Sequence, residues 1–174
     1  MSLRNINIGD KTPSIVNVAI EIASGSHEKY EYDSITDSMI LDRVLPAFFS
    51  YPTDYGFIPE TLSGDGDHLD ALLIQKLPSS LGSIVEMRVI GVLEMADEKG
   101  QDYKIVGVPN NDESMGNILE ITDLDPILLN KISHFFEDYK KLEDTKFSQV
   151  GYFKNKDFAI QEIIRSHETY LKNL

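Results

Sequence analysis

The stretch Val-Asn-Val-Ala-Ile-Glu-Ile at residues 16–22 alternates aliphatic side chains with Asn17, Ala19 and Glu21. A period of two is typical of a half-buried β-strand, and it sends Glu21 to the face opposite the aliphatic side chains. This stretch predicts that the first half of the chain is built from strands.

The segments that follow continue the strand pattern. Between residues 27 and 33, Lys29 and Glu31 share one face while Tyr30 and Tyr32 share the other. The segment 51–59 contains two prolines and a glycine, so it is predicted as a loop rather than a helix. Aliphatic runs bounded by turn residues predict further strands at residues 39–43, 71–74, 84–95 and 103–109.

The last third of the chain changes to a helical period. One apolar stripe opens at Asp125-Pro126 and consists of Leu128, Ile132, Phe135, Tyr139 and Leu142. A second stripe, for which Asn155 is the candidate N-cap, consists of Ile160, Ile163, Ile164, His167 and Leu171. Strands followed by helices indicate an α+β fold, a curled antiparallel sheet or barrel packed against two helices.

Length and composition restrict the class of protein. The 174 residues suit one domain, and the net charge of −13 with a pI near 4.6 argues against nucleic acid or an anionic membrane as a partner. The absence of cysteine excludes disulfides, thiolate nucleophiles and cysteine-ligated zinc. No apolar run reaches the ~18 residues that cross a membrane, so we expect a cytoplasmic protein.

The segment 65–70, Asp-Gly-Asp-His-Leu-Asp, is the strongest candidate for chemistry. Its three carboxylates repel one another unless a cation lies between them, and oxygen ligands favour Mg²⁺, Mn²⁺ or Ca²⁺. An EF-hand loop is excluded because Leu69 occupies its third acidic position and Lys76 its twelfth. An acidic surface turn remains the alternative for this motif taken alone.

A second charged cluster spans residues 97–104, where Asp102 and Lys104 face the same way if the segment is extended. Read alone, it is a solvated hairpin turn, and the scattered cations and phenols are surface or core-rim residues. Read together with the acidic segment, these groups suit a small, highly charged phosphate substrate that metals and cations bind jointly. No glycine-rich phosphate loop is present, which disfavours a nucleotide.

Several separated motifs resemble those of the family I soluble inorganic pyrophosphatases of bacterial type. They keep the family's order and spacing over about residues 14–143, and DGDHLDAL is similar to its D-x-D-P-x-D signature. The others are IEI, KYE, LDR, YPTDYGFIPET, GVLEMADEKGQDYKIVGVP and HFFEDYKKLE. The resemblance implies one pyrophosphatase-like domain over residues 1–174, a closed five-stranded antiparallel barrel with two main C-terminal helices, and a homohexamer.

The resemblance also implies Mg²⁺-dependent hydrolysis of pyrophosphate by direct attack of a metal-activated water, with several ions per subunit and Mn²⁺ or Zn²⁺ as substitutes. The implied metal residues are Asp65, Asp70, Asp102, Asp97, Glu21 and, in an outer shell, Glu31. The implied catalytic residues are Asp67, which accepts the proton of the water, Tyr55 and Arg43, which neutralises the departing phosphate. The implied substrate-binding residues are Lys29, Arg43, Tyr55, Lys104, Tyr139 and Lys140.

The chain departs from the family pattern at His68, Ala23 and Asp54, where Pro, Pro and Asn are usual. We expect His68 to be an exposed loop residue that faces solvent rather than a fourth metal ligand. Two other functions remain as alternatives: a metal-dependent phosphohydrolase acting on a larger phosphate ester or nucleotide, and a non-enzymatic divalent-ion binding module.

Overall fold

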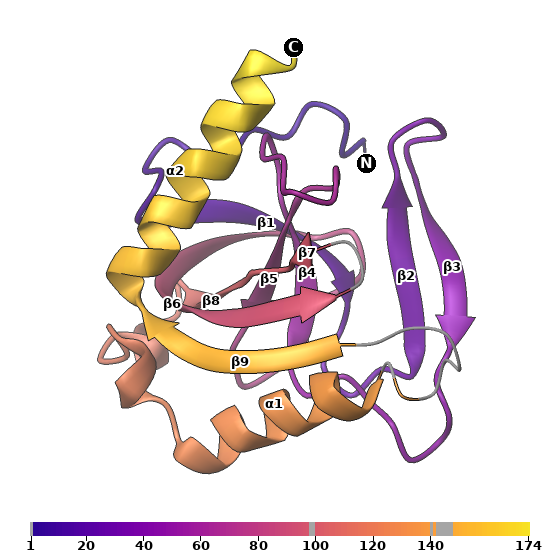
Figure 1. The fold of residues 1–174 in the computed structure, drawn as a ribbon, viewed down its shortest axis with the longest axis vertical. Helices are drawn as coiled ribbons and strands as arrows, with labels where there is room; N and C mark the ends of the chain where they lie inside the picture. Colours follow the sequence, from indigo (N-terminus) through magenta and orange to yellow (C-terminus); the bar gives the residue numbers. More distant parts are fainter. Residues whose placement is uncertain (1, 98–99, 140, 142–147) are drawn as a thin grey trace.

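The computed structural model describes residues 2–97, 100–139, 141 and 148–174, without the side chains of Asp97 and Ser148. Its centre is the predicted closed five-stranded barrel (Figure 1). The strands follow one another around the barrel in the order β1 (Ile15–Ile22), β4 (Asp54–Ile58), β5 (Leu69–Leu73), β8 (Lys104–Pro109) and β6 (Ile84–Asp97), and β6 pairs back onto β1.

One pairing in the barrel differs from the predicted antiparallel arrangement. The pairs β1–β4, β4–β5, β6–β8 and β1–β6 are antiparallel, whereas β5 and β8 run parallel. The order of the strands in the sequence explains why β5 and β8 are parallel. Strand β6 follows β5 in the sequence and reverses the direction of the chain, and β8 then pairs between β5 and β6. In the β5–β8 pair, Asp70 lies opposite Lys104.

The segment 51–59, predicted as a loop, contains strand β4. Gly56 explains how this strand fits, because a Cβ there would lie 2.0 Å from the carbonyl oxygen of Ala19 on β1. The two prolines flank β4 rather than interrupt it, so its backbone groups remain free to pair. The glycine read as a loop signal thus permits a close contact between two strands.

Four further strands in the described part of the chain lie outside the five-stranded barrel. The hairpin β2 (Glu28–Asp33) and β3 (Ser38–Val44) forms a separate two-stranded sheet. Strand β9 (Ser148–Asn155), which sequence analysis missed, pairs with residues 91–97 of β6. The short β7 (Gly100–Gln101) pairs with the last two residues of β6. In Figure 1 the hairpin stands beside the barrel, on the side to which the arrow of β6 points.

The two predicted helices are α1 (Pro126–Tyr139) and α2 (Lys156–Lys172), and two 3₁₀ turns, η1 (Glu113–Met115) and η2 (Ile121–Asp123), precede them. Asn155 caps α2, as predicted, because its Oδ1 accepts the N–H of Phe158 at 3.1 Å. The predicted stripe on α2 is wrong in part, since Ile164 and Leu171 are exposed and the buried residues are Ala159, Glu162, Ile163 and Ser166. Leu142 of the first stripe lies outside the described residues.

Three apolar clusters stabilise this arrangement. One joins the barrel to α1 through Ile132, Phe135 and Phe136, and another joins it to α2 through Ala159 and Ile163. A third, small cluster connects an N-terminal segment to the outside of β1 and β4, so both faces of β1 are covered and Glu21 is buried rather than on a solvent face. In the part of the chain described, no helix is long and apolar enough to span a membrane.

Candidate active site

Lys104 lies at the centre of the candidate active site, at the start of β8. Its ammonium Nζ is 2.6 Å from Oδ2 of Asp70 and 3.0 and 3.2 Å from the two carboxylate oxygens of Asp102. The parallel β5–β8 register places Asp70 opposite Lys104, and Asp102, two residues before Lys104, contacts the same ammonium. Two predicted metal ligands and one predicted phosphate ligand therefore meet in one ion-paired group.

Burial and charge act in opposite directions on these groups. Burial alone would lower the pKa of Lys104, but the carboxylates of Asp70 and Asp102 outweigh this effect and raise it. Burial raises the pKa of Asp70, with a further contribution from Asp102, although Lys104 lowers it. The lysine stays protonated at neutral pH, and Asp70 is a carboxylate that an additional cation would stabilise in its charged form.

Glu21 lies on β1 beside this group and is also a predicted metal ligand. Its Oε1 accepts the backbone N–H of Tyr32 on β2 at 2.8 Å. Burial raises the pKa of Glu21 to about 8, an effect that this hydrogen bond partly offsets and that repulsion from Asp70 and Glu31 increases. Glu21 and Asp70 therefore belong to one electrostatic centre even though they come from different strands.

The hairpin supplies the predicted cations. Lys29 forms ion pairs with Glu31 and, at 3.2 Å, with Asp42, and Nε of Arg43 lies 2.7 Å from the same carboxylate of Asp42. Burial lowers the pKa of Lys29 and of Arg43, but Tyr139, at the end of α1, and the carboxylates of the hairpin raise both, with the hydrogen bond to Asp42 ahead of Tyr139 for Arg43. The structure thus brings hairpin cations together with the helix residue predicted to bind substrate beside them.

Tyr55 connects the barrel part of the site to the aromatic core. Its hydroxyl lies 3.5 Å from Nζ of Lys104, and the ammonium also lies 5.4 Å from the ring centres of Tyr55 and Phe136. Burial, followed by repulsion from Asp70 and Asp102, raises the pKa of Tyr55 well above its usual range. The phenol therefore stays neutral and can donate a hydrogen bond to an anion.

The acidic loop at residues 65–70 is less assembled than predicted. Oδ1 of Asp65 accepts the backbone N–H of Asp67 at 3.2 Å, and Asp67 is exposed. Within the described residues no group of three or more Asp, Glu or His side chains converges closely enough to hold a metal ion. The predicted first set of Asp65, Asp70 and Asp102 therefore does not surround one point, and the ammonium of Lys104 lies between two of its members.

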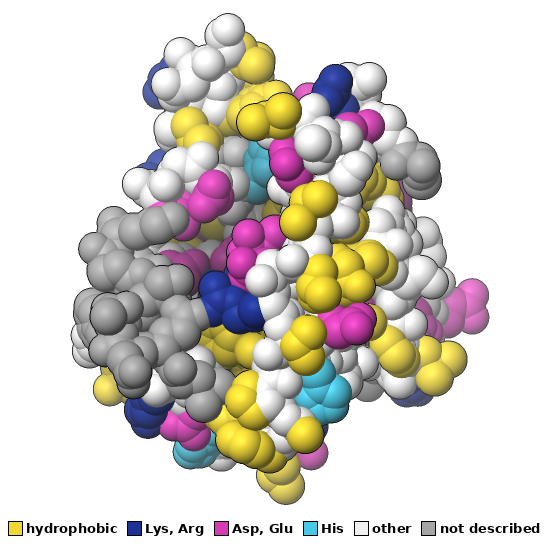
Figure 2. All heavy atoms as spheres, turned by 90° about the vertical axis from the view of Figure 1, so that its right-hand side faces the viewer, with side chains coloured by type: hydrophobic (Ala, Val, Ile, Leu, Met, Phe, Trp, Pro, Cys, Tyr) yellow, Lys and Arg dark blue, Asp and Glu magenta, His cyan; other side chains and the backbone are white. Residues whose placement is uncertain are grey.

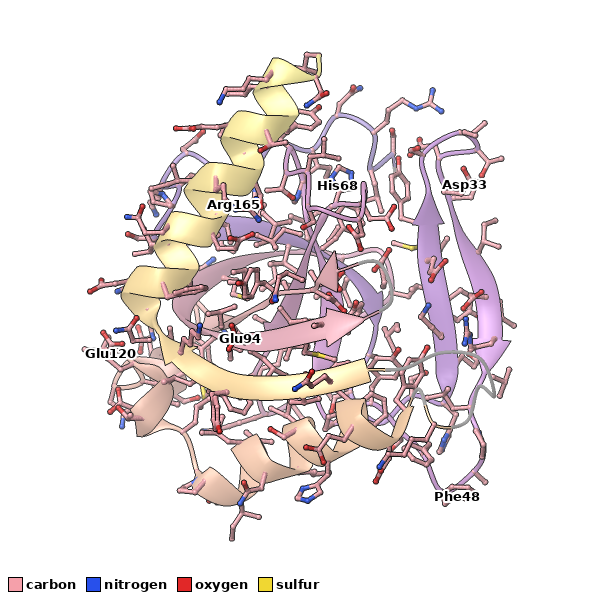
Figure 3. All side chains as sticks on the ribbon, viewed as in Figure 1. Asp33, Phe48, His68, Glu94, Glu120 and Arg165 are labelled. Atoms are coloured by element: carbon pink, nitrogen blue, oxygen red, sulfur yellow. The ribbon has the colours of Figure 1, made fainter. Side chains whose placement is uncertain are left out.

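His68 does not behave as the solvent-facing loop residue that we expected. Its Nδ1 lies 2.9 Å from the carbonyl oxygen of Thr61, and its ring stacks on Phe57 with centroids 4.9 Å apart and planes 12° apart. Figure 3 shows it between α2 and the hairpin, and it contributes to a cavity of about 480 Å³ rather than to the carboxylate group. The expectation that it is not a metal ligand stays a prediction.

Two predicted site residues cannot be placed. Lys140 lies outside the described residues, and the side chain of Asp97, at the end of β6, lies outside them as well. Figure 2 shows acidic and basic side chains lying together on the face that carries the hairpin.

Sequence analysis missed two site-supporting carboxylates, Asp42 and Asp54. Asp42 lies inside the motif LDR. The signal that could have identified it is that Lys29 and Arg43, both predicted to bind substrate, need a negative charge near them. Asp54 is 1% exposed, and its oxygens accept the N–H groups of Ser24, Gln75 and Ser79 at 2.6 to 2.8 Å. It joins the end of β1 to β4 next to Tyr55, a role that only the folded chain reveals.

The donor set of this site suits a hard divalent cation. Oxygen ligands from carboxylates are those that Mg²⁺ and Mn²⁺ prefer, and Glu21, Asp70 and Asp102 carry such oxygens in a partly buried place, although the three do not converge on one point. Burial, with a smaller contribution from neighbouring carboxylates, raises the pKa of Glu21 and of Asp70, and a bound cation would favour their charged forms. Anions with several oxygens would meet Lys29, Arg43 and Tyr55 at the same site.

Comparison with known proteins shows relatives over almost the whole chain. The family model described as inorganic pyrophosphatase matches residues 18–171. The inorganic pyrophosphatase of Thermus thermophilus is 43% identical over 164 residues, 93% of this chain and 94% of the relative, and that of Sulfolobus acidocaldarius is 49% identical over 82% and 84%. The crystal structure of the Thermus thermophilus protein matches with a TM-score of 0.94 and 42% identity over 98% of this chain and 99% of that one.

Proposed function

The chain belongs to the inorganic pyrophosphatase family and is an inorganic diphosphatase, and we propose that it hydrolyses pyrophosphate by direct attack of water, without a covalent intermediate. The observation that carries this mechanism is the convergence of buried carboxylates and cations from separate elements. Asp70, Asp102 and Lys104 meet in the barrel wall, and Lys29 and Arg43 stand on the hairpin with Tyr139 beside them. This set suits a small substrate that is mostly phosphate.

We assign the metal-binding role to Asp65, Asp70, Asp102, Asp97 and Glu21, with Glu31 hydrogen-bonding from outside. Mg²⁺ bound there supplies positive charge to the phosphate oxygens and acidifies a bound water. Lys104 keeps its charge and holds Asp70 and Asp102 in place. The exposed carboxylate of Asp67 accepts the proton of the attacking water.

The remaining residues act on the substrate. Lys29 and Arg43 bind phosphoryl oxygens through charge-assisted hydrogen bonds, and Lys140 joins them in this assignment. Arg43 neutralises the charge that develops on the departing phosphate. Tyr55 donates a hydrogen bond because its raised pKa keeps the phenol protonated, and Tyr139 orients Arg43.

The finer properties are also proposals. We propose Mg²⁺ as the activating ion, Mn²⁺ and Zn²⁺ as substitutes, and a cytoplasmic location. We further propose a single pyrophosphatase-like domain over residues 1–174 that forms a homo-oligomer, a hexamer. Exposed apolar side chains such as Leu77 and Ile127, 79% and 76% exposed, support association, which light scattering would measure.

The direct test is phosphate release from pyrophosphate with Mg²⁺. We expect activity that a chelator removes and Mg²⁺ restores, whereas Ca²⁺ binds without supporting turnover because its longer, looser coordination misplaces the water. Nucleoside triphosphates and phosphate esters form the comparison panel. Full activity in a chelator would contradict the metal-dependent mechanism, and preference for a larger substrate would favour the alternative phosphohydrolase.

Two matched substitutions test the metal assignment. At saturating Mg²⁺ we expect Asp70→Asn to lower kcat far more than Asp97→Asn does. Asp70 belongs to the group that activates water, whereas Asp97 is assigned to an ion that arrives with substrate, so additional Mg²⁺ compensates for its loss. Equal losses with the same Mg²⁺ dependence would contradict this order.

A further inference from the structure

The N-terminal segment holds the tip of the β2–β3 hairpin. The backbone N–H of Leu3 donates to Oδ1 of Asp37 at 3.0 Å, and the guanidinium of Arg4 donates to the carbonyl oxygens of Ser34 and Ile35 at 3.1 and 2.9 Å. Figure 1 shows the N-terminus beside this tip, and Figure 3 labels Asp33 there. We call Leu3, Arg4 and Asp37 the clasp.

Tyr32 connects the clasp to the active site. Its hydroxyl donates to the same Oδ1 of Asp37 at 2.8 Å, and its ring stacks on Phe57 of β4 with centroids 5.5 Å apart. Its backbone N–H donates to Glu21. The side chain of Tyr32 is therefore anchored to Asp37 and Phe57, while its backbone N–H holds Glu21, a proposed metal ligand.

The hairpin needs such an anchor because its two strands form their own sheet, separate from that of the barrel. Leu3 and Phe57 are buried in a small apolar cluster between the N-terminal segment, β1 and β4, and Tyr32 and Met39 of the hairpin pack against it. The same hairpin carries Lys29 and Arg43 near its other end. Movement at the tip would therefore move the phosphate-binding cations relative to Asp70 and Asp102.

The backbone conformation and the charge of Asp37 both favour this contact. It has a φ of 53°, which most residues with a side chain avoid but Asp and Asn tolerate. Hydrogen bonds from Ser2 and Tyr32 lower the pKa of its carboxyl, which keeps it a charged acceptor.

We propose that Tyr32 and Asp37 are positioning residues: with the N-terminal clasp, they hold the hairpin so that Glu21, Lys29 and Arg43 face the barrel carboxylates when substrate binds. This inference rests on the proposed function, because it takes Glu21 and the two cations as ligands of the metal–pyrophosphate substrate. If the hairpin also adopts other positions, the apparent affinity for substrate falls in proportion to the fraction of molecules in which the hairpin is correctly placed. Saturating substrate shifts the population back to the correct position, so kcat changes little.

The test compares Asp37→Gly with Asp37→Asn. Glycine accepts the positive φ but removes the acceptor, whereas asparagine keeps an oxygen acceptor at the same φ. We expect Asp37→Gly to raise KM for magnesium pyrophosphate ~5- to 10-fold with kcat within about twofold, which is the size expected from losing one typical hydrogen bond. Asp37→Asn should stay close to wild type.

A second pair changes the ring. Tyr32→Ala removes both the hydroxyl and the stack on Phe57, and it should raise KM at least as much as Asp37→Gly. Tyr30→Ala is its matched control on the same strand, since among the residues that the structure describes the hydroxyl of Tyr30 donates to Glu28 of β2, at 3.4 Å. We expect KM of this control to match wild type.

Two readouts do not need turnover. Amide hydrogen exchange at Tyr32 should accelerate more than tenfold in Asp37→Gly while amides of β5 and β8 stay protected. Calorimetric binding of imidodiphosphate with Mg²⁺ should weaken in parallel with KM. Wild-type KM, exchange and binding in both Asp37→Gly and Tyr32→Ala would overturn the clasp, whereas a wild-type protein that binds imidodiphosphate but does not hydrolyse pyrophosphate would overturn only the proposed function.

Discussion

Lys104 is a cation in the wall of the barrel, with only 4% of its surface exposed. A buried ammonium is stable there because two carboxylates, Asp70 and Asp102, surround it. The same ammonium reduces the repulsion between those two carboxylates, so the stability of the folded protein depends on the positive charge of Lys104.

Replacing Lys104 tests this link. Lys104→Met should lower the free energy of unfolding by about 3 kcal/mol or more in a chelator, because two partly buried carboxylates then face each other without a counter-charge. Mg²⁺ should recover much of the loss. Urea unfolding with and without Mg²⁺ measures both effects, and Lys154→Met, which breaks the more exposed pair with Glu94, is the control. An equal loss in both variants would contradict the argument.

His68 packs against Phe57, and we expect it to have no part in catalysis. His68→Ala removes the stack on Phe57 and the contact with the Thr61 carbonyl, so it should lower the free energy of unfolding by about 1 to 2 kcal/mol. Activity with Mg²⁺ should stay within severalfold of wild type, and the ratio of Zn²⁺ to Mg²⁺ activation should not change. A selective loss of Zn²⁺ activation would instead make His68 part of the metal site.

At the scale of elements, the closeness of β1 and β4 determines whether the barrel closes. Gly56→Ala should lower the free energy of unfolding by about 3 kcal/mol or more, because the new Cβ would overlap the carbonyl oxygen of Ala19. Thermal and urea unfolding measure the loss. Gly64→Ala, where a Cβ would meet no atom within 4 Å, is the matched control and should change little. A stable Gly56→Ala barrel would show that the two strands can separate.

At the scale of the whole molecule, divalent ions should stabilise the fold. A ligand that binds only the native state adds about 2.7 kcal/mol at a hundredfold excess over its Kd, so Mg²⁺ should raise Tm. Asp70→Asn combined with Asp102→Asn should lose most of that increase, because the ligands are gone. An increase as large as in wild type would place the stabilising ions elsewhere.

Stability without metal should also depend on pH through Glu21. Its folded-state pKa of about 8 lies above the ordinary value of 4.5, so the folded protein keeps a proton that the unfolded chain releases. This stabilisation is complete below pH 4.5 and is lost as pH rises through about 8. Urea unfolding in a chelator should show it, and Glu21→Gln should have a flatter profile between pH 5 and pH 9. Identical profiles would mean that Glu21 is charged in the folded protein.

The amino-acid sequence by itself determined the local elements. Alternation placed β1, aliphatic runs bounded by turn residues placed β6 and β8, the period of Leu128 to Tyr139 placed α1, and Asn155 marked the start of α2. These signals are local because side-chain periodicity and caps depend on neighbours within a few residues. Charge patterns and motif resemblance also singled out Glu21, Asp70, Asp102 and Lys104, which lie near one another in the fold.

Tertiary structure decided the contacts between distant segments. The parallel β5–β8 pairing, the strand β4 within a proline-rich segment and the covered outer face of β1 all depend on which segments meet. The same holds for Asp42 between two cations, for His68 against Phe57 and for the clasp on Asp37. A local pattern specifies the direction of a side chain along its own strand or helix, but burial and partners depend on residues far away in the sequence.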